Sequence, residues 1–269
     1  MLRPRTLRRW LSTAAAALLV TAMAPAAISS AAPEPKFVDH AMGSQIARHE
    51  GTAAAPSRVA MAATASVQGI DVSHWQGTVN WASQWSAGKR FVWIKATEAS
   101  NYTDPNFSAN YTGSYNQGFI RGAYHFAEPN QSSGATQANY FSAHGGGWSG
   151  DGRTLPGALD LEYGTSSDCW GLSQASMRTW ISDFVTTYHA RWTKYPIIYT
   201  STSWWSECVG SYSVSGTDPL WVARYNSTVG TLPYNWSYYT VWQYSDSPMD
   251  QDVFNGSAAQ LTTFATNHD

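Results

Sequence analysis

The stretch GALDLE at residues 157–162 is a short apolar run that carries two acids spaced two residues apart. Alternate side chains of a β-strand share one face, so Asp160 and Glu162 would point the same way, with Cα atoms roughly 6.5–7 Å apart. Leu159 and Leu161 would point to the other face. Two acids buried side by side raise the pKa of one of them. A protonated acid beside an ionised one is what glycosidic bond cleavage needs, although an exposed Asp-x-Glu on a strand edge has the same pattern.

Strand and helix patterns alternate outward from this stretch. Apolar runs predict strands at 67–72, 91–97, 119–127, 155–162 and 196–200. Between them lie helical patterns at 104–118, 132–144 and from Ser173 onward, with a short helix at 203–208. The pattern then changes to strands at 220–224, 240–244 and 250–254 without clear helices between them. Five βα units followed by a few strands predict an α/β fold in a single domain.

Four acids fall at the ends of these predicted strands, namely Asp71, Glu98, Asp160 and Glu162. A parallel barrel gathers the C-terminal ends of its strands at one mouth, and active sites of such barrels lie there. Acids that converge from different strands indicate an active site built on carboxylates.

The composition narrows the function further. The 269 residues include 14 Trp and 15 Tyr, a profile that suits a secreted protein with extended aromatic surfaces. The 16 basic residues do not exceed the 18 acidic ones, which argues against nucleic-acid binding.

The N-terminus has the pattern of a secretory signal peptide over residues 1–32. Four arginines precede an apolar run at 14–24, and small residues follow it. The pair at residues 8–9 leaves open whether the general or the twin-arginine pathway exports the chain. No other segment approaches 18 apolar residues, so we expect no membrane association of the mature protein.

Residues 33–66 are rich in Ala, Pro and Ser, and little of this stretch is expected to pack. We interpret it as a flexible leader or pro-segment, which places the catalytic barrel at residues 67–269. The only cysteines, Cys169 and Cys208, are expected to form one disulfide in an oxidising compartment. Two cysteines without a matching histidine cluster make a poor zinc site, so no metal is predicted.

Five motifs in order resemble glycoside hydrolase family 25, the Chalaropsis-type lysozymes or N-acetylmuramidases, and most of all the secreted lysozymes of actinomycetes. They are GIDVSHWQG at 69–77, IKATE at 94–98, RGAYHF at 121–126, LDLE at 159–162 and VWQY at 241–244. The resemblance runs from about residue 67 to the C-terminus. One departure is Ala99, which stands after the Glu of the second motif where relatives often carry Gly.

The resemblance implies a modified β/α barrel that hydrolyses the β-1,4 bond between N-acetylmuramic acid and N-acetylglucosamine in peptidoglycan. It implies Glu162 as proton donor, with Asp160 and Asp71 assisting. A further Asp near the C-terminus falls on Asp250, although Asp252 lies two positions on and leaves this transfer ambiguous.

The roles of the other acids stay open at this point. We expect ionised Asp71 and Asp160 to raise the pKa of Glu162 and keep it protonated near neutral pH. Asp160 could orient the 2-acetamido group of the substrate as an internal nucleophile, or Asp71 or Asp250 could position a water molecule.

Candidate substrate-binding side chains also lie near strand ends. Tyr124 could reach an acetamido pocket or could be a packed core residue, and Glu98 ends its strand. Trp75, Trp221 and Trp242 are candidates for stacking on sugar rings.

Other readings of the sequence predict different chemistry. A non-catalytic wall-binding module would keep the aromatic residues but could lose an acid, and all four matching acids are present. A metal-dependent deacetylase would need an Asp with two His as ligands, and we find no such set. We therefore expect a secreted, monomeric lysozyme without a cofactor, which acts on bacterial peptidoglycan outside the cell.

Overall fold

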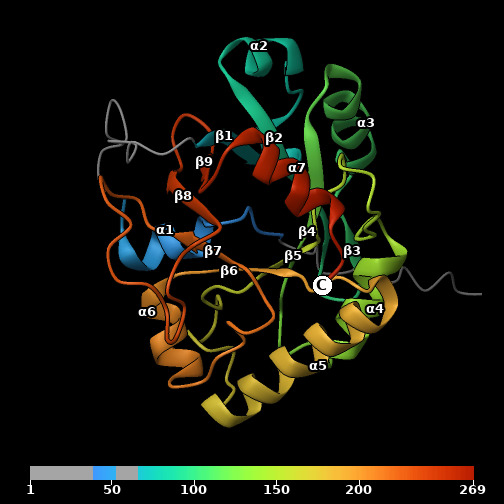
Figure 1. The fold of residues 1–269 in the computed structure, drawn as a ribbon. Helices are drawn as coiled ribbons and strands as arrows, with labels where there is room; N and C mark the ends of the chain where they lie inside the picture. Colours follow the sequence, from blue (N-terminus) through green and yellow to red (C-terminus); the bar gives the residue numbers. More distant parts are fainter. Residues whose placement is uncertain (1–38, 53–65) are drawn as a thin grey trace, which may run out of the picture. The chain divides into compact units, whose positions relative to one another are not determined.

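The computed structural model describes residues 39–52 and 66–269. Eight strands close into a barrel, and the short β3 pairs with the end of β2 outside that ring (Figure 1). The strands are β1 Val67–Val72, β2 Lys89–Glu98, β3 Tyr102–Thr103, β4 Ile120–Phe126, β5 Ala158–Asp160, β6 Ile197–Thr200, β7 Leu220–Ala223, β8 Val241–Ser245 and β9 Gln251–Phe254.

Seven strands of the ring run parallel in the order β1-β2-β4-β5-β6-β7-β8. The last strand, β9, pairs antiparallel with both β8 and β1 and closes the ring. This mixed closed barrel confirms the predicted α/β barrel of βα units followed by extra strands.

The helices are α1 Ser44–Glu50, η1 His74–Gln76, α2 Trp81–Ser86, α3 Phe107–Gln117, α4 Gly134–Ala143, α5 Gln174–Trp192, α6 Thr202–Trp204, η2 Trp205–Val209 and α7 Ala258–Thr266. As expected from the sequence, Ser173 caps α5, because its side chain accepts a hydrogen bond from the backbone of Ser176. None of the helices in the described part of the chain is long and apolar enough to cross a membrane.

Some boundaries differ from those expected. The helix predicted to open at Asp104 begins at Phe107, because Asp104 turns its carboxylate to the backbone N–H groups of His74 and Asn106, at 2.9 and 2.8 Å. Strand β5 ends at Asp160, so Glu162 lies just beyond the strand and not within it. Ala99 has φ 49°, in the left-handed region that favours Gly, so a Gly would fit the backbone of this turn with less strain.

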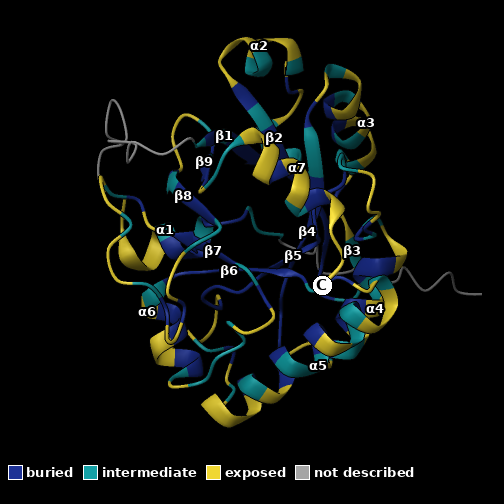
Figure 2. Ribbon diagram, in the orientation of Figure 1, coloured by how far each residue is buried: buried dark blue, intermediate teal, exposed yellow. Residues whose placement is uncertain are grey.

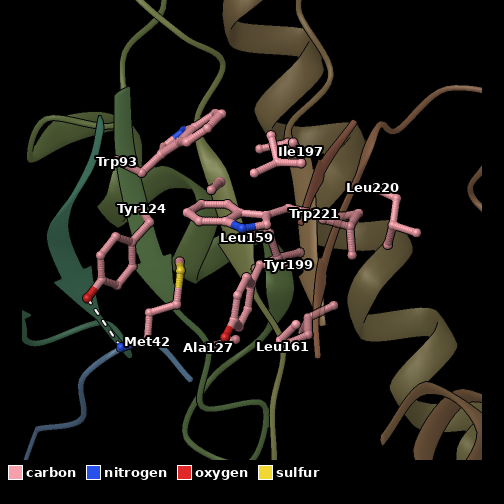
Figure 3. Packing of buried hydrophobic residues seen from close by; sticks show 14 of the residues in the cluster. Met42, Trp93, Tyr124, Ala127, Leu159, Leu161, Ile197, Tyr199, Leu220 and Trp221 are labelled. Carbon is pink, nitrogen blue, oxygen red and sulfur yellow. Dashed lines mark hydrogen bonds between the residues drawn. The ribbon is translucent and has the colours of Figure 1, made fainter. Parts of the chain in front are cut away.

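Large aromatic side chains fill the barrel. Trp93 and Trp221 are fully buried, with ring centroids 4.7 Å apart, and Tyr199 meets Trp221 edge-on at 5.2 Å. Figure 3 shows these rings together with Leu159 and Ile197 from the neighbouring strands β5 and β6. The burial of the residues matches this arrangement. In Figure 2 the barrel strands are mostly coloured as buried, whereas the outer surface of α5 is largely exposed.

A disulfide joins Cys169, in the loop before α5, to Cys208 in η2, as the sequence predicted. It closes a loop with a sequence separation of 39 residues. Such a loop contributes about 3–4 kcal/mol in the chain-entropy account of disulfides.

Residues 39–52 fold as part of the same compact unit as the barrel. The sequence placed them in a stretch with little capacity to pack. Instead they form α1, and the side chains of Met42 and Ile46 are 2% and 1% exposed in the main core cluster.

Candidate active site

Five buried acids gather at one end of the barrel, and each is placed there by a strand. Asp71 lies near the end of β1, Asp160 is the last residue of β5, and Glu162 follows two residues later. Asp250 immediately precedes β9 and Asp252 lies within it. The antiparallel direction of β9 lets the start of that strand meet the ends of its neighbours, so the mouth of the barrel is strongly acidic.

Glu162 is held by backbone donors from residues 39–52. Its Oε1 accepts from the N–H of Gly43 at 2.7 Å, and its Oε2 accepts from Gln45 at 2.7 Å and Ile46 at 3.0 Å. Burial raises the pKa of Glu162 to about 7, against these three hydrogen bonds, which favour the ionised form.

Asp160 lies beside Glu162 without a donor of its own. Within residues 39–52 and 66–269, no N–H or hydroxyl group donates a hydrogen bond to either oxygen of its buried carboxyl, whose hydrogen-bonding neighbour is the carboxyl of Glu162. Burial, followed by the charge of Glu162, raises the pKa of Asp160 well above its usual range. The pKa of both carboxyls is raised by burial, while the three backbone donors favour the ionised form of Glu162.

Asp71 and Asp252 form a second acid pair deeper in the barrel. They are linked by a hydrogen bond, and burial followed by the charges of Asp250 and Asp252 raises the pKa of Asp71 well above its usual value. Trp221 donates its indole N–H to Asp252 Oδ1 at 3.0 Å, and Gln243 donates its amide to Asp71 Oδ2 at 2.6 Å.

Gln243 is a connecting residue to which the sequence assigned no role. Its Oε1 accepts hydrogen bonds from Tyr199 at 2.6 Å and Tyr225 at 2.8 Å, while its amide binds Asp71. The sequence did contain a sign of this cluster, because Tyr199 lies near the end of β6 and Tyr225 just beyond the end of β7. Together they form a buried polar layer between Asp71 and the mouth.

The structure separates the two acids that the sequence left ambiguous. Asp252 is fully buried and bonded to Asp71 and Trp221. Asp250 is 7% exposed, and its pKa is raised well above its usual range by burial and then by the charges of Asp252, Asp246 and Glu162. Asp250 is thus the acid of this pair that the charge of Glu162 influences.

Glu98 lies at the same end of the barrel in an ion-pair cluster. It contacts the ammonium of Lys95 and accepts from the backbone N–H of His40 at 2.9 Å, while the His40 ring lies 2.6 Å away. Burial opposes ionisation, but these partners lower the pKa of Glu98 below its usual value. Its neighbour Glu128 has a pKa raised to about 8 by burial and by Glu98.

Two groups of acids and histidines near this cluster have the spacing of ion ligands: Asp39 with His74 and Asp104, and His40 with Glu98 and Glu128. Lys95 already supplies a positive charge between them, since its Nζ lies 3.2 Å from Asp39 and also contacts Glu98. The absence of a metal therefore stays a prediction.

The aromatic candidates are placed differently from one another. Trp75 is 58% exposed beside the mouth residue His74 and is available to a sugar ring. Trp221 is fully buried inside the barrel, and Trp242 donates its indole N–H to the carbonyl of Arg224 at 2.8 Å. Both rings are buried in this structure, so Trp75 is the most exposed of the three candidates for stacking on sugar. The Tyr124 hydroxyl faces the mouth and accepts from Met42 N–H at 3.4 Å (Figure 3).

One further acid, Asp218, is buried before β7, away from the mouth. One carboxyl oxygen accepts from Thr217 at 2.6 Å, and the other has no donor in the described part of the chain. Burial raises the pKa of Asp218 to about 8. Its stabilising contribution is complete below the unfolded pKa near 4 and is lost as the pH rises through 8.

We expect Asp218→Asn to raise the free energy of unfolding at pH 8 by about 2–4 kcal/mol relative to the parent, with little difference at pH 4. Urea unfolding at both pH values measures this. Asp168→Asn, which removes an exposed carboxyl, controls for net charge. An equal effect of Asp218→Asn at both pH values would contradict the buried-acid account.

Comparisons with known proteins give a consistent picture. The sequence model of the family "Glycosyl hydrolases family 25" matches residues 70–253. The chain is 48% identical to lysozyme M1 of Streptomyces globisporus over 268 residues, which cover 94% of this chain and 91% of that protein. It is 52% identical to the N,O-diacetylmuramidase of Chalaropsis sp over 213 residues, which cover 75% of this chain and 100% of that protein.

Solved structures agree with these matches. A muramidase from Trichobolus zukalii has a TM-score of 0.73 and 52% identity, over 74% of this chain and 99% of its own. A bacterial lysozyme from Streptomyces coelicolor has the same score and identity, over 77% of this chain and 99% of its own.

Proposed function

The chain belongs to glycosyl hydrolases family 25 and is a glycoside hydrolase of the lysozyme type, and on that premise we propose a specific reaction for it. It hydrolyses the β-1,4 bond between N-acetylmuramic acid and N-acetylglucosamine in bacterial peptidoglycan. Relatives named as muramidases support this substrate.

The observation that carries the proposal is the buried pair Asp160 and Glu162 at the mouth of the barrel. Two adjacent buried carboxyls whose pKa values are both raised can supply an acid and a charged group when one of them is protonated and the other ionised. Cleavage passes through an oxocarbenium-like transition state, so the leaving oxygen must be protonated while positive charge at C1 is stabilised.

Glu162 is the acid in this proposal. The three N–H groups that hold it ionised come from residues 43–46, outside the part of the chain that matches the family. Without those donors, burial favours the protonated form of Glu162. Its proton then passes to the glycosidic oxygen as the bond from C1 to that oxygen breaks.

Asp160 orients the 2-acetamido group of the substrate, whose carbonyl oxygen attacks C1. Its buried carboxyl has no donor in residues 39–52 or 66–269, so it is open to the N–H of a bound acetamido group. Water then opens the cyclic intermediate, with Glu162 accepting a proton. Asp71 and Asp250 contribute two further buried carboxyls beside this site. In the alternative mechanism, Asp71 or Asp250 positions a water molecule that attacks C1 directly, and the acetamido group does not act as a nucleophile.

The proposal also assigns a role to each part of the chain and a place where the enzyme acts. Residues 1–32 act as the export signal, residues 33–66 as a leader or pro-segment, and residues 67–269 as the catalytic barrel. The enzyme acts outside the cell as a monomer, as befits a polysaccharide substrate in the bacterial wall.

The test is product analysis on purified peptidoglycan with a chain that begins at Ser66. We expect new reducing ends on muramic acid, identified by borohydride reduction and mass spectrometry. New reducing ends on glucosamine would make the enzyme a glucosaminidase and overturn the proposal. Wall binding without cleavage would favour the non-catalytic wall-binding module.

A further inference from the structure

Residues 39–52 lie across the mouth of the barrel. His40 contacts Glu98 at the end of β2, Gly43 contacts Glu162 beyond β5, and Glu50 contacts Ser201 beyond β6. In Figure 1 this segment, drawn in blue, runs beside β7 and β8. It therefore spans the strand ends where the proposed active site lies.

The segment is bound to Glu162, the acid of the proposed reaction. Both oxygens of Glu162 are taken by the backbone N–H groups of Gly43, Gln45 and Ile46, at 2.7–3.0 Å. Glycan cannot reach these oxygens while the segment is in place. Hydrogen bonds from backbone to a buried carboxylate also favour its ionised form, which has no proton to give to a leaving group.

Other contacts of the segment are specific as well. The His40 ring stacks on Phe126 with centroids 5.0 Å apart, and Lys95 donates to Asp39. At the other end, Tyr163 donates to Glu50 at 3.1 Å. Met42 inserts beside Tyr124 and Tyr199, as Figure 3 shows. Apolar, ionic and backbone contacts thus hold the segment along its whole length.

Some related proteins form the barrel without this segment, although the match to lysozyme M1 covers 94% of this chain. The family match begins at residue 70, and the muramidase from Trichobolus zukalii matches 74% of this chain with 99% of its own. The fold and the acids of the mouth are therefore complete in the remaining three-quarters, so the segment is an addition to the barrel.

We propose that residues 39–52 are an autoinhibitory segment that occupies the active site and must leave it before glycan can bind. The inference rests on the proposed function, because it assigns a regulator to that same site. The segment's contacts with Glu162, Tyr124 and Glu98 make it a competitor of the glycan at the mouth.

Two glycines allow a matched test in the full chain. Gly43 and Gly51 both have a positive φ, 77° and 74°. Gly43 has ψ −10°, in the left-handed region, whereas Gly51 has ψ 169°, in a region that is essentially restricted to Gly, so an Ala at Gly51 has the greater backbone strain. A Cβ at Gly43 would lie 2.0 Å from the Tyr225 hydroxyl and 2.8 Å from that of Tyr199, whereas a Cβ at Gly51 would meet nothing within 4 Å. Only Gly43→Ala should dislodge the segment.

The experiment compares four proteins for release of reducing ends from peptidoglycan: the full chain, the chain from Ser66, and full-chain Gly43→Ala and Gly51→Ala. We expect the full chain and Gly51→Ala to be at least about tenfold slower than the chain from Ser66, since each lost hydrogen bond to a charged group is worth about that factor. Gly43→Ala should recover most of the rate. A full chain as fast as the chain from Ser66 would overturn the proposal.

A binding measurement separates this inference from the proposed reaction. Calorimetry with a soluble tetrasaccharide of alternating N-acetylglucosamine and N-acetylmuramic acid should show binding to the chain from Ser66 and not to the full chain. A synthetic peptide of residues 39–52 should compete with the tetrasaccharide in the chain from Ser66. If that chain binds the tetrasaccharide without cleaving it, the proposed reaction fails while the inhibition stands. Equal binding by both chains would refute the inhibition.

Discussion

Glu162→Gln is expected to lower the rate of peptidoglycan cleavage by about 10³–10⁴-fold, because a carboxamide cannot protonate the leaving oxygen. The measurement is the initial rate of reducing-end release by the chain from Ser66, which lacks the segment that binds Glu162. Binding of a soluble glycan fragment should change much less than the rate, since the amide keeps the size and polarity of the side chain.

Asp218→Asn is the matched control for this variant. It makes the same change from acid to amide at a buried position that lies before β7 and outside the mouth. We expect its rate to equal that of the parent. A Glu162→Gln enzyme that retained more than about a tenth of the parental rate would show that another group supplies the proton.

Asp160→Asn is expected to lower kcat by about 10²–10³-fold, because an amide no longer supplies the negative charge that stabilises the oxazolinium-like intermediate. A thiazoline analogue of that intermediate should bind the parent and lose its affinity in this variant. The parent's product should keep the β configuration at C1 when followed by NMR during hydrolysis, as expected for two successive displacements.

Asp71→Asn and Asp250→Asn are the comparison set for that prediction. If the acetamido group attacks C1, both variants should retain thiazoline binding and lose less activity than Asp160→Asn. An inverted product, together with the largest loss in Asp71→Asn or Asp250→Asn, would assign the attack to a water molecule positioned by those acids.

Much of the fold could be predicted from local signals. Alternating apolar runs and the cap at Ser173 located the strands and α5, and the Asp-x-Glu pair marked the mouth. The final helix, α7, was missed, although Ser257 and Gln260 form a capping box at its start. The first two acids, Asp71 and Glu98, fall at strand ends as the pattern indicated.

Side-chain direction could not be read in the same way. Strands β6 and β7 are buried on both faces, so their sequences do not alternate and give no sign of which side chains point into the barrel. Trp221 therefore resembled a surface aromatic although it packs on Trp93 inside the barrel.

The position of residues 39–52 could not be predicted from the sequence either. A helix of seven residues is too short to form on its own, and it depends on contacts with residues far along the chain. Those contacts include the backbone donors to Glu162, which favour its ionised form and could not be anticipated from the Asp-x-Glu pattern.

The antiparallel strand β9 makes the site depend on a strand that lies far along the sequence from β1. It pairs with β1 and supplies Asp252 to Asp71, while Gln243 of β8 reaches Asp71 across a sequence separation of 172 residues. Contacts between such distant parts of a chain form late, because the loop between them must be closed first. A nascent or prematurely terminated chain therefore has no closed barrel and no complete set of mouth acids.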